Sequence, residues 1–337
     1  MLGGGVVWAR PNAQGTLGII AINMGRECKT AVAPLKDGST LGGSVAGAIL
    51  LAAVVSAPAA VRSQPVPDHV FTDAHVHLND PKAWIRLMDD AGIARAVVLR
   101  GRDIDNQELL AAGQRWPERL LPFLSVSPEH REHRGRWEAD DPTLVETVES
   151  LLEAGGFYGI GEISVSHFPG RGFPEADFDP RGRVMRGILA AARRYAVPVL
   201  VHVEVTRLKE LAEVLEDFRD VTVIWAHGGY TPLVLAERML AQHPNLVYEL
   251  SARTWQRHPR SPDYTILRND SDVWPEWIAL IEQQPDRFVI GTDASLPSLA
   301  SDAQKITSVW GLLDQLDPQV RRKVAGENLD RILGIGN

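Results

Sequence analysis

The first candidate functional residues in the chain are two histidines separated by a single residue. His75 and His77 stand in the segment TDAHVHLND, residues 72–80, which has the character of a short strand. Side chains two residues apart in a strand point to the same face, so both imidazoles should point the same way. Two buried imidazoles on one face need either hydrogen-bond partners or a bound cation. The pair alone leaves both interpretations open.

Four further residues of types that can bind a metal ion lie at the ends of other apolar runs. They are Glu162 in GIGEIS, His202 in VLVHVE, His227 in VIWAHGG and Asp293 in VIGTDAS. Each one alone has an ordinary explanation, such as a hydrogen-bonded core histidine or a helix cap. Together the six residues suit one or two divalent ions, with zinc first and manganese, iron, cobalt or nickel as alternatives. The single cysteine, Cys28, falls in an expected leader, so we expect nitrogen and oxygen ligands only.

The elements that must position these residues alternate regularly. Eight apolar strand candidates cover residues 69–78, 94–101, 120–128, 157–165, 198–204, 221–229, 245–252 and 287–295. Each is followed by a stretch of helical length, such as residues 142–155, whose apolar residues recur at a 3.6-residue period. This alternation predicts an α/β fold, and eight units in one domain favour a (β/α)8 TIM barrel. A barrel would gather the six candidate ligands at the C-terminal ends of its strands.

The motifs DAHVH, GEI, VLVH, AHGG and GTD, with the closing GENLDRILG, resemble the amidohydrolase superfamily of metal-dependent TIM-barrel hydrolases. The resemblance covers about residues 69–335. A glutamate at position 162 is similar to TatD-type members, whereas many other members carry a carboxylated lysine there. The sequence around VIWAHGG and NLVYELSAR is more similar to the amidohydrolase-related group, which contains lactonases and decarboxylases.

The resemblance also implies how the ligands are shared. One ion would be bound by His75, His77 and Asp293, a second by His202 and His227, with Glu162 bridging the two. An ion of this kind lowers the pKa of bound water to about 7. We expect Asp293 to be the catalytic residue that takes the proton of the water and passes it to the leaving group.

Substrate-binding residues are expected at the remaining strand ends. The candidates are Arg100, Ser127, Ser164, Arg253 and Trp255. An arginine close to the ions would suit an anionic group on a small-molecule substrate.

The leading functional hypothesis is a metal-dependent hydrolase of a small ester, lactone or amide. The alternatives are a metal-dependent decarboxylase, a TatD-type phosphodiesterase or nuclease, and a non-catalytic binding or scaffold protein with a structural metal. The formal net charge of −8 disfavours nucleic acid as a partner. The sequence contains no G-x-S-x-G elbow, G-K-[ST] phosphate loop or HExxH motif. Serine hydrolase, nucleotide-binding and zincin functions therefore have no support in the sequence.

The N-terminal region is expected to be a leader. Residues 41–55, LGGSVAGAILLAAVV, form an uncharged apolar run that is followed by the cleavage signature Ala57-Pro58-Ala59. We therefore expect a signal peptide within a leader of residues 1–63, and a single barrel domain over residues 64–337. The leader is long for a signal peptide, so we expect Met24 to be the natural start and residues 1–23 to be untranslated. A periplasmic or secreted protein without a membrane anchor follows, and its oligomeric state is left open.

Overall fold

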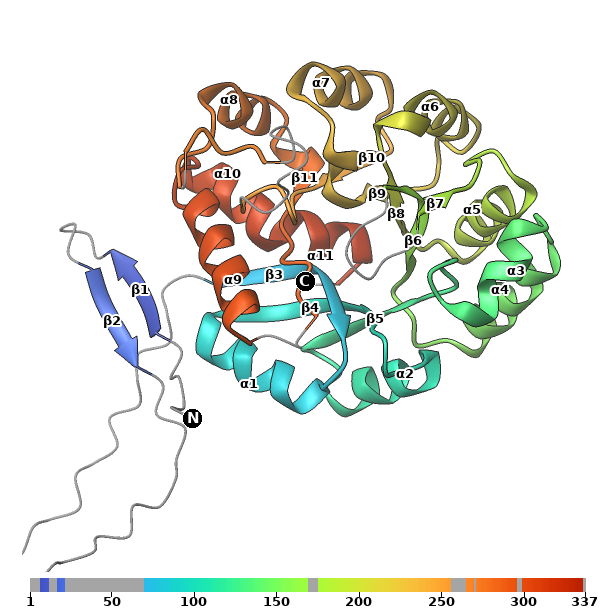
Figure 1. Cartoon of the computed structure of the whole chain (residues 1–337), viewed down its shortest axis with the longest axis horizontal. Helices are drawn as coiled ribbons and strands as arrows, with labels where there is room; N and C mark the ends of the chain where they lie inside the picture. Colours follow the sequence, from blue (N-terminus) through green and yellow to red (C-terminus); the bar gives the residue numbers. More distant parts are fainter. Residues whose placement is uncertain are drawn as a thin grey trace, which may run out of the picture. The chain divides into compact units, whose positions relative to one another are not determined.

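Eight parallel strands form a barrel in which neighbours in the chain are neighbours in the sheet (Figure 1). The strands are β3 (Phe71–Leu78), β4 (Ile93–Arg100), β5 (Leu120–Leu124), β6 (Gly159–His167), β8 (Val199–Val203), β9 (Val223–Trp225), β10 (Leu246–Glu249) and β11 (Phe288–Val289). A two-residue strand, β7 (Ala176–Asp177), pairs antiparallel with β6. The predicted (β/α)8 fold class is confirmed.

The barrel closes between its first and last strands. The backbone N–H of Ala74 donates to the carbonyl of Ile290 at 2.9 Å, and that of His77 donates to the carbonyl of Ala294 at 2.8 Å. The buried Asp73 adds a side-chain link, because it accepts hydrogen bonds from the N–H and the hydroxyl of Thr292. These bonds bring the histidine pair of β3 beside the segment that carries Asp293.

The helices surround the barrel, as Figure 1 shows. They are α1 (Pro81–Ala91), α2 (Asn106–Arg115), α3 (Arg131–Glu138), α4 (Thr143–Ala154), α5 (Arg183–Tyr195), α6 (Leu208–Asp217), α7 (Leu233–Gln242), α8 (Pro275–Gln283), α9 (Leu299–Leu313), α10 (Pro318–Arg322) and α11 (Asn328–Leu333). Helix α1 begins where Asp80 caps the N–H of Ala83 and ends at the left-handed Gly92. Its apolar side, including the fully buried Trp84 and Met88, faces the core.

An apolar cluster fills the barrel below the strand ends. Its strand members are Ala74, Val97, Leu99, Leu121, Phe123, Leu200, Ile224, Val247 and Val289. The candidate ligands lie beyond these residues: His75 and His77 follow Ala74 on β3, and His202 follows Leu200 on β8. The apolar cluster therefore places the candidate ligands at the C-terminal end of the strands.

The computed structural model describes residues 7–11, 17–21, 70–168, 175–255, 265–269, 271–295 and 299–335. The chain divides into two units, Met1–Pro67 and Asp68–Asn337. In the first unit, β1 (Val7–Pro11) and β2 (Leu17–Ala21) form an antiparallel pair. The apolar run 41–55, the cleavage signature and Met24 lie outside the described residues. Within the described ranges, none of the helices has the length and apolar character that a membrane span requires.

Candidate metal centre

The first group of candidate ligands converges from β3, β6 and the segment that follows β11. His75 Nε2 and His77 Nε2 lie 3.2 Å apart, and Glu162 Oε2 lies 3.4 Å and 3.3 Å from them. Asp293 Oδ1 completes the group at 3.8 Å from His75 Nε2 and 3.5 Å from His77 Nε2. His75 and Glu162 are buried, whereas the side chain of Asp293 is 29 % exposed and so is the most open of the four.

The hydrogen-bond partners of His75 Nδ1 and His77 Nδ1 show which nitrogen of each ring is left to bind an ion. His75 Nδ1 is 3.3 Å from a carboxylate oxygen of Glu249, and His77 Nδ1 is 3.3 Å from the carbonyl oxygen of Arg100. Because both oxygens accept, each Nδ1 must carry the hydrogen, and each Nε2 then presents a lone pair. Two lone pairs that face each other at 3.2 Å, beside two carboxylates, are unfavourable unless a proton or a metal ion neutralises them. The donor set fits a divalent ion bound by nitrogen and oxygen.

A second group shares the other oxygen of Glu162. His202 Nδ1 lies 3.1 Å from Glu162 Oε1, and His227 Nε2 lies 3.8 Å from the same oxygen. His227 Nδ1 is 3.1 Å from the carbonyl oxygen of Ser251, so it donates there and leaves Nε2 as a lone pair. His202 Nε2 faces Glu204 at 3.3 Å. Glu162, His202 and His227 therefore form a second candidate set, in which Glu162 could bridge two ions.

Glu249, at the end of β10, orients both groups. This buried carboxylate accepts from His75 Nδ1, from the N–H of His227 at 3.2 Å, and from the N–H and hydroxyl of Ser251. With its oxygens engaged in this way, Glu249 is better suited to hold ligand rings in place than to bind an ion itself. A carboxylate behind a ligating histidine fixes the tautomer and the ring orientation.

The turn that carries His227 has an unusual backbone. His227, Gly228, Gly229 and Tyr230 all have positive φ, between 51° and 56°. A Cβ on Gly228 would lie 1.8 Å from the ring of Tyr248, and one on Gly229 would lie 2.2 Å from the carbonyl oxygen of Val203. The two glycines are therefore required sterically. Asp293 also has positive φ, at 49°, and such conformations in non-glycine residues gather at functional sites.

The electrostatics of the two groups favour a cation. Burial lowers the pKa of His75, but Glu162 and Glu249 outweigh burial and raise that pKa well above its ordinary value. Burial also opposes the shift at His202, whose pKa is nonetheless raised to about 10 by Glu162 and Glu204. Burial and the neighbouring His202 lower the pKa of His227 to about 4. Burial acts to raise the pKa of Glu162, but the surrounding histidines hold it well below its usual range. The ionised carboxylates attract positive charge, which protonated imidazoles supply in the metal-free site and which a bound cation would supply in their place.

Comparison with known proteins agrees with this geometry. The sequence model of the amidohydrolase family matches residues 72–335. The chain belongs to the amidohydrolase family. A comparison with curated proteins found no match.

Solved structures share the fold of this amidohydrolase at low sequence identity. A TIM-barrel protein from Bordetella bronchiseptica is 17 % identical, with a TM-score of 0.54 over 78 % of this chain and 98 % of its own. An amidohydrolase from Burkholderia multivorans is 13 % identical, with a TM-score of 0.52 over 80 % of this chain and 100 % of its own. A 2,6-dihydroxybenzoate decarboxylase from Rhizobium is 14 % identical, with a TM-score of 0.50 over 79 % of this chain and 99 % of its own.

Three of the predicted substrate residues lie near the strand ends with their own partners. Arg100 forms an ion pair with Glu132 and donates from Nε to the carbonyl of Ile104 at 2.9 Å. Ser127 and Ser164 are buried, and the hydroxyl of Ser127 accepts from the N–H of Ser164 at 3.1 Å. The serine pair thus links the end of β6 to the segment after β5.

The other two predicted substrate residues are buried at the end of β10. Trp255 is 9 % exposed, and Lys305 Nζ lies 5.2 Å from the centroid of its ring. Lys305 also contacts the backbone carbonyl of Asp293. Arg253 is 1 % exposed, and its two terminal nitrogens donate to backbone carbonyls. Both terminal nitrogens of Arg253 are thus engaged by the protein itself, and a substrate contact by Arg253 stays a prediction.

Among the described residues, the buried or half-buried carboxylates near the ligands that the sequence analysis did not single out include Glu129, Glu204 and Glu249. Glu129 lies 3.2 Å from His167, another histidine at the end of β6. Glu204 and Glu249 stand at the ends of VLVHVE and NLVYE. A carboxylate at the end of an apolar strand is the same signal that identified Glu162, so both were open to prediction.

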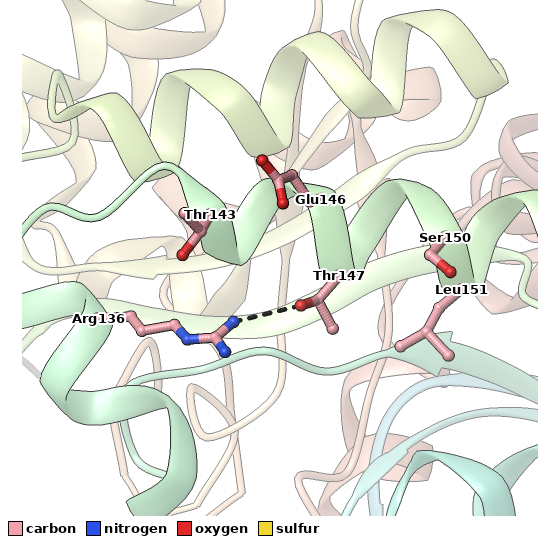
Figure 2. Close-up of a pocket in the computed structure, with 6 residues that line it drawn as sticks. All are labelled: Arg136, Thr143, Glu146, Thr147, Ser150 and Leu151. Atoms are coloured by element: carbon pink, nitrogen blue, oxygen red, sulfur yellow. Dashed lines mark hydrogen bonds between the residues drawn. The ribbon is translucent and has the colours of Figure 1, made fainter.

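A surface hollow lies away from the candidate ligands. Its volume is about 440 Å³, and it is lined by Arg136, Thr143, Glu146, Thr147, Ser150 and Leu151. Figure 2 shows these residues on the outer helices, where Arg136 donates to the hydroxyl of Thr147 at 3.2 Å. The hollow contains no candidate ligand, so it has no part in the chemistry of the metal centre.

Proposed function

We propose that this amidohydrolase is a metal-dependent hydrolase of small esters, lactones or amides. The observation that carries the proposal is the convergence of His75 Nε2, His77 Nε2, Glu162 Oε2 and Asp293 Oδ1, with both Nδ1 atoms already engaged. Zinc is our first choice of ion because it accepts a mixture of imidazole and carboxylate ligands without a geometric preference of its own. An additional ion in the second group would make Glu162 a bridge.

A divalent ion bound by these residues supplies a Lewis acid for a carbonyl group and lowers the pKa of coordinated water to about 7. Asp293 is the carboxylate best placed to move protons, because it is partly exposed while Glu162 is buried. Burial raises the pKa of Asp293, but Lys305 and the nearby histidines outweigh burial and lower that pKa. Asp293 is therefore ionised at neutral pH, and it accepts the proton of the attacking water and donates it to the leaving group.

The test is metal-dependent turnover in a panel of small esters, lactones and amides. We expect a chelator to abolish hydrolysis and added zinc to restore it. Elemental analysis of the purified protein measures how many ions are bound. Full turnover by metal-free protein would contradict the proposal, and so would turnover that survives replacement of both His75 and His77 by glutamine.

Decarboxylation is the second candidate. The first group brings four candidate ligands together, His75, His77, Glu162 and Asp293, and four ligands are sufficient for a single-ion enzyme. The fold is also that of the Rhizobium 2,6-dihydroxybenzoate decarboxylase. Release of carbon dioxide from hydroxybenzoates, by a protein that binds one ion and hydrolyses no ester, would favour this candidate over hydrolysis. A TatD-type nuclease is disfavoured by the acidic net charge.

We further propose that the protein is exported to the periplasm or secreted, and that no membrane anchor remains after cleavage. The support is the apolar run 41–55 and the signature at residues 57–59. N-terminal sequencing of the protein from its native cells tests this, and a product that begins at Met1 would contradict it.

A further inference from the structure

A buried arginine lies directly behind the second ligand group. Arg253 follows β10, is 1 % exposed, and donates from Nη1 to the carbonyl of His227 at 3.3 Å and from Nη2 to the carbonyl of Thr231 at 2.9 Å. The guanidinium also lies over the rings of Tyr248 and Trp277, at 5.9 Å and 5.2 Å from their centroids. Its described contacts are thus carbonyl oxygens and aromatic faces.

The two carbonyls that Arg253 binds stand at either end of the left-handed turn. The turn runs from His227 to Tyr230, and Thr231 is the first residue after it with an extended backbone. A left-handed run costs roughly 1–2 kcal/mol for each non-glycine residue, so the two non-glycine members need external support. The planar guanidinium is suited to this, because its donors have a fixed spacing and can hold two acceptors at once.

The conformation of the turn decides where His227 points. The N–H of His227 donates to Glu249, and its Nδ1 donates to Ser251, which leaves Nε2 directed at Glu162. These bonds fix the N–H and the ring of His227, and Arg253 fixes the carbonyls at the two ends of the turn. A change in the separation of the two carbonyls would rotate the backbone at His227 and carry Nε2 away from Glu162.

We propose that Arg253 is a positioning residue for His227: by bridging the carbonyls of His227 and Thr231, it keeps His227 Nε2 aimed at Glu162 and so completes the second ligand group. The consequence for activity rests on the proposed metal-dependent function, whereas the positioning of the ring does not.

The barrel offers a matched control. Arg287, at the opposite end of the barrel, is a partly buried arginine that, like the fully buried Arg253, donates to backbone carbonyls, here of Leu240, His243 and Leu246. Its replacement by lysine removes the same kind of interaction from the same fold, far from the ligands. Loss of stability alone should therefore be common to Arg253→Lys and Arg287→Lys.

The experiment compares these two variants with the unaltered protein. Imidazole ¹⁵N NMR spectra of metal-free protein report the tautomer and surroundings of His227, and zinc titration reports affinity. We expect Arg253→Lys to shift the His227 signals and to weaken zinc binding at the second ligand group by about 10–100-fold. Zinc binding at the first ligand group should be unchanged. Arg287→Lys should change neither. Unchanged His227 signals in Arg253→Lys, or the same changes in Arg287→Lys, would overturn the proposal.

A double-mutant cycle makes the assignment specific. In a His227→Gln background, Arg253→Lys should have no further effect on zinc affinity, because its effect acts through His227. Additive losses would overturn the proposal. If Arg253→Lys fails to fold, Arg253→Gln, which keeps one donor group without the charge, takes its place. Absence of turnover in the unaltered protein would count against the proposed function alone, since the NMR measurement still decides the role of Arg253.

Discussion

The two ends of the barrel use buried polar groups in opposite ways. At the N-terminal end of the strands, side-chain donors meet backbone acceptors: Asn245 Nδ2 donates to the carbonyls of Leu215, Phe218 and Val221, and Asn328 Nδ2 donates to those of Pro285 and Phe288. At the C-terminal end, acceptors face acceptors. The lone pairs of His75 and His77 point at each other, with the oxygens of Glu162 and Asp293 beside them.

This difference separates stability from chemistry within one fold. Donor–acceptor pairs at the N-terminal end hold helices and strands together without any further component. Converging acceptors at the C-terminal end are unfavourable unless a cation neutralises them. Changes at one end should therefore alter activity and metal binding, and changes at the other should alter unfolding only.

The largest expected effect comes from Asp293. We expect Asp293→Asn to retain most of the bound metal but to lower kcat by about 10²–10⁴-fold, because the amide cannot accept the proton of the water. The measurement is kcat on the best substrate of the panel, together with metal content. Asp286→Asn is the control, since Asp286 pairs with Lys323 at the other end of the barrel. Equal losses in the two variants would remove the distinction between the ends.

Glu249 should have the next largest effect. Glu249→Gln replaces the carboxylate behind His75 and His227 with an amide, and we expect zinc affinity to fall by about 10–100-fold. Titration against a competing chelator measures this. Glu216→Gln is the matched control because Glu216 also faces a histidine, His243, at 3.2 Å, but at the N-terminal end. Unchanged affinity in Glu249→Gln would mean that the orientation of the rings does not depend on Glu249.

A smaller effect should appear in the pH dependence of unfolding. The pKa of His202 is raised to about 10 from an ordinary value of 6.5, against the effect of burial, by Glu162 and Glu204. A raised pKa stabilises the folded chain fully below about pH 6.5, and this contribution is lost as the pH rises toward 10.

In chelator-treated protein, Tm should therefore fall between pH 6.5 and 10, by about 2–4 °C for each kcal/mol lost. Zinc-loaded protein should lack this decline, because an ion replaces the proton at the ligand nitrogens. Thermal unfolding with and without chelator over this range tests the expectation. Parallel Tm curves for the two forms would count against a metal centre at these residues.

The smallest effect on catalysis should follow from changes at Arg287. Arg287→Lys removes bonds to three carbonyls, and we expect a loss of about 1–3 kcal/mol in the free energy of unfolding. We expect kcat and zinc affinity to stay at the levels of the unaltered protein. Denaturant unfolding and steady-state kinetics measure both quantities. A fall in kcat that is not explained by unfolded protein would mean that the two ends are coupled.

The sequence was sufficient to predict the eight strands, because apolar runs alternate with helical periodicity along the whole barrel. It also predicted which residues could meet, because a parallel barrel gathers its strand ends. The residues at which the strands end were less predictable. The strand expected over 221–229 ends at Trp225, since the left-handed turn at His227 interrupts the extended backbone.

The direction of side chains beyond the strand ends could not be predicted. Glu249 is the last residue of β10, Arg253 and Trp255 follow within six residues, and sequence patterns assign all three to the same end of the barrel. The chain turns at Ala252, whose φ is 56°, and Arg253 is buried behind His227. A positive φ at alanine has no sequence signature, because it depends on contacts made by the rest of the fold.

The closure of the barrel has a consequence for how the protein is made. During translation, the histidine pair of β3 leaves the ribosome long before Ile290, Asp293 and Ala294, which give β3 its backbone partners and the ligand group its last carboxylate. A nascent or prematurely terminated chain that stops at β10 has neither a closed cylinder nor a complete set of ligands. The set of candidate ligands is therefore complete only after the segment that follows β11 has been made.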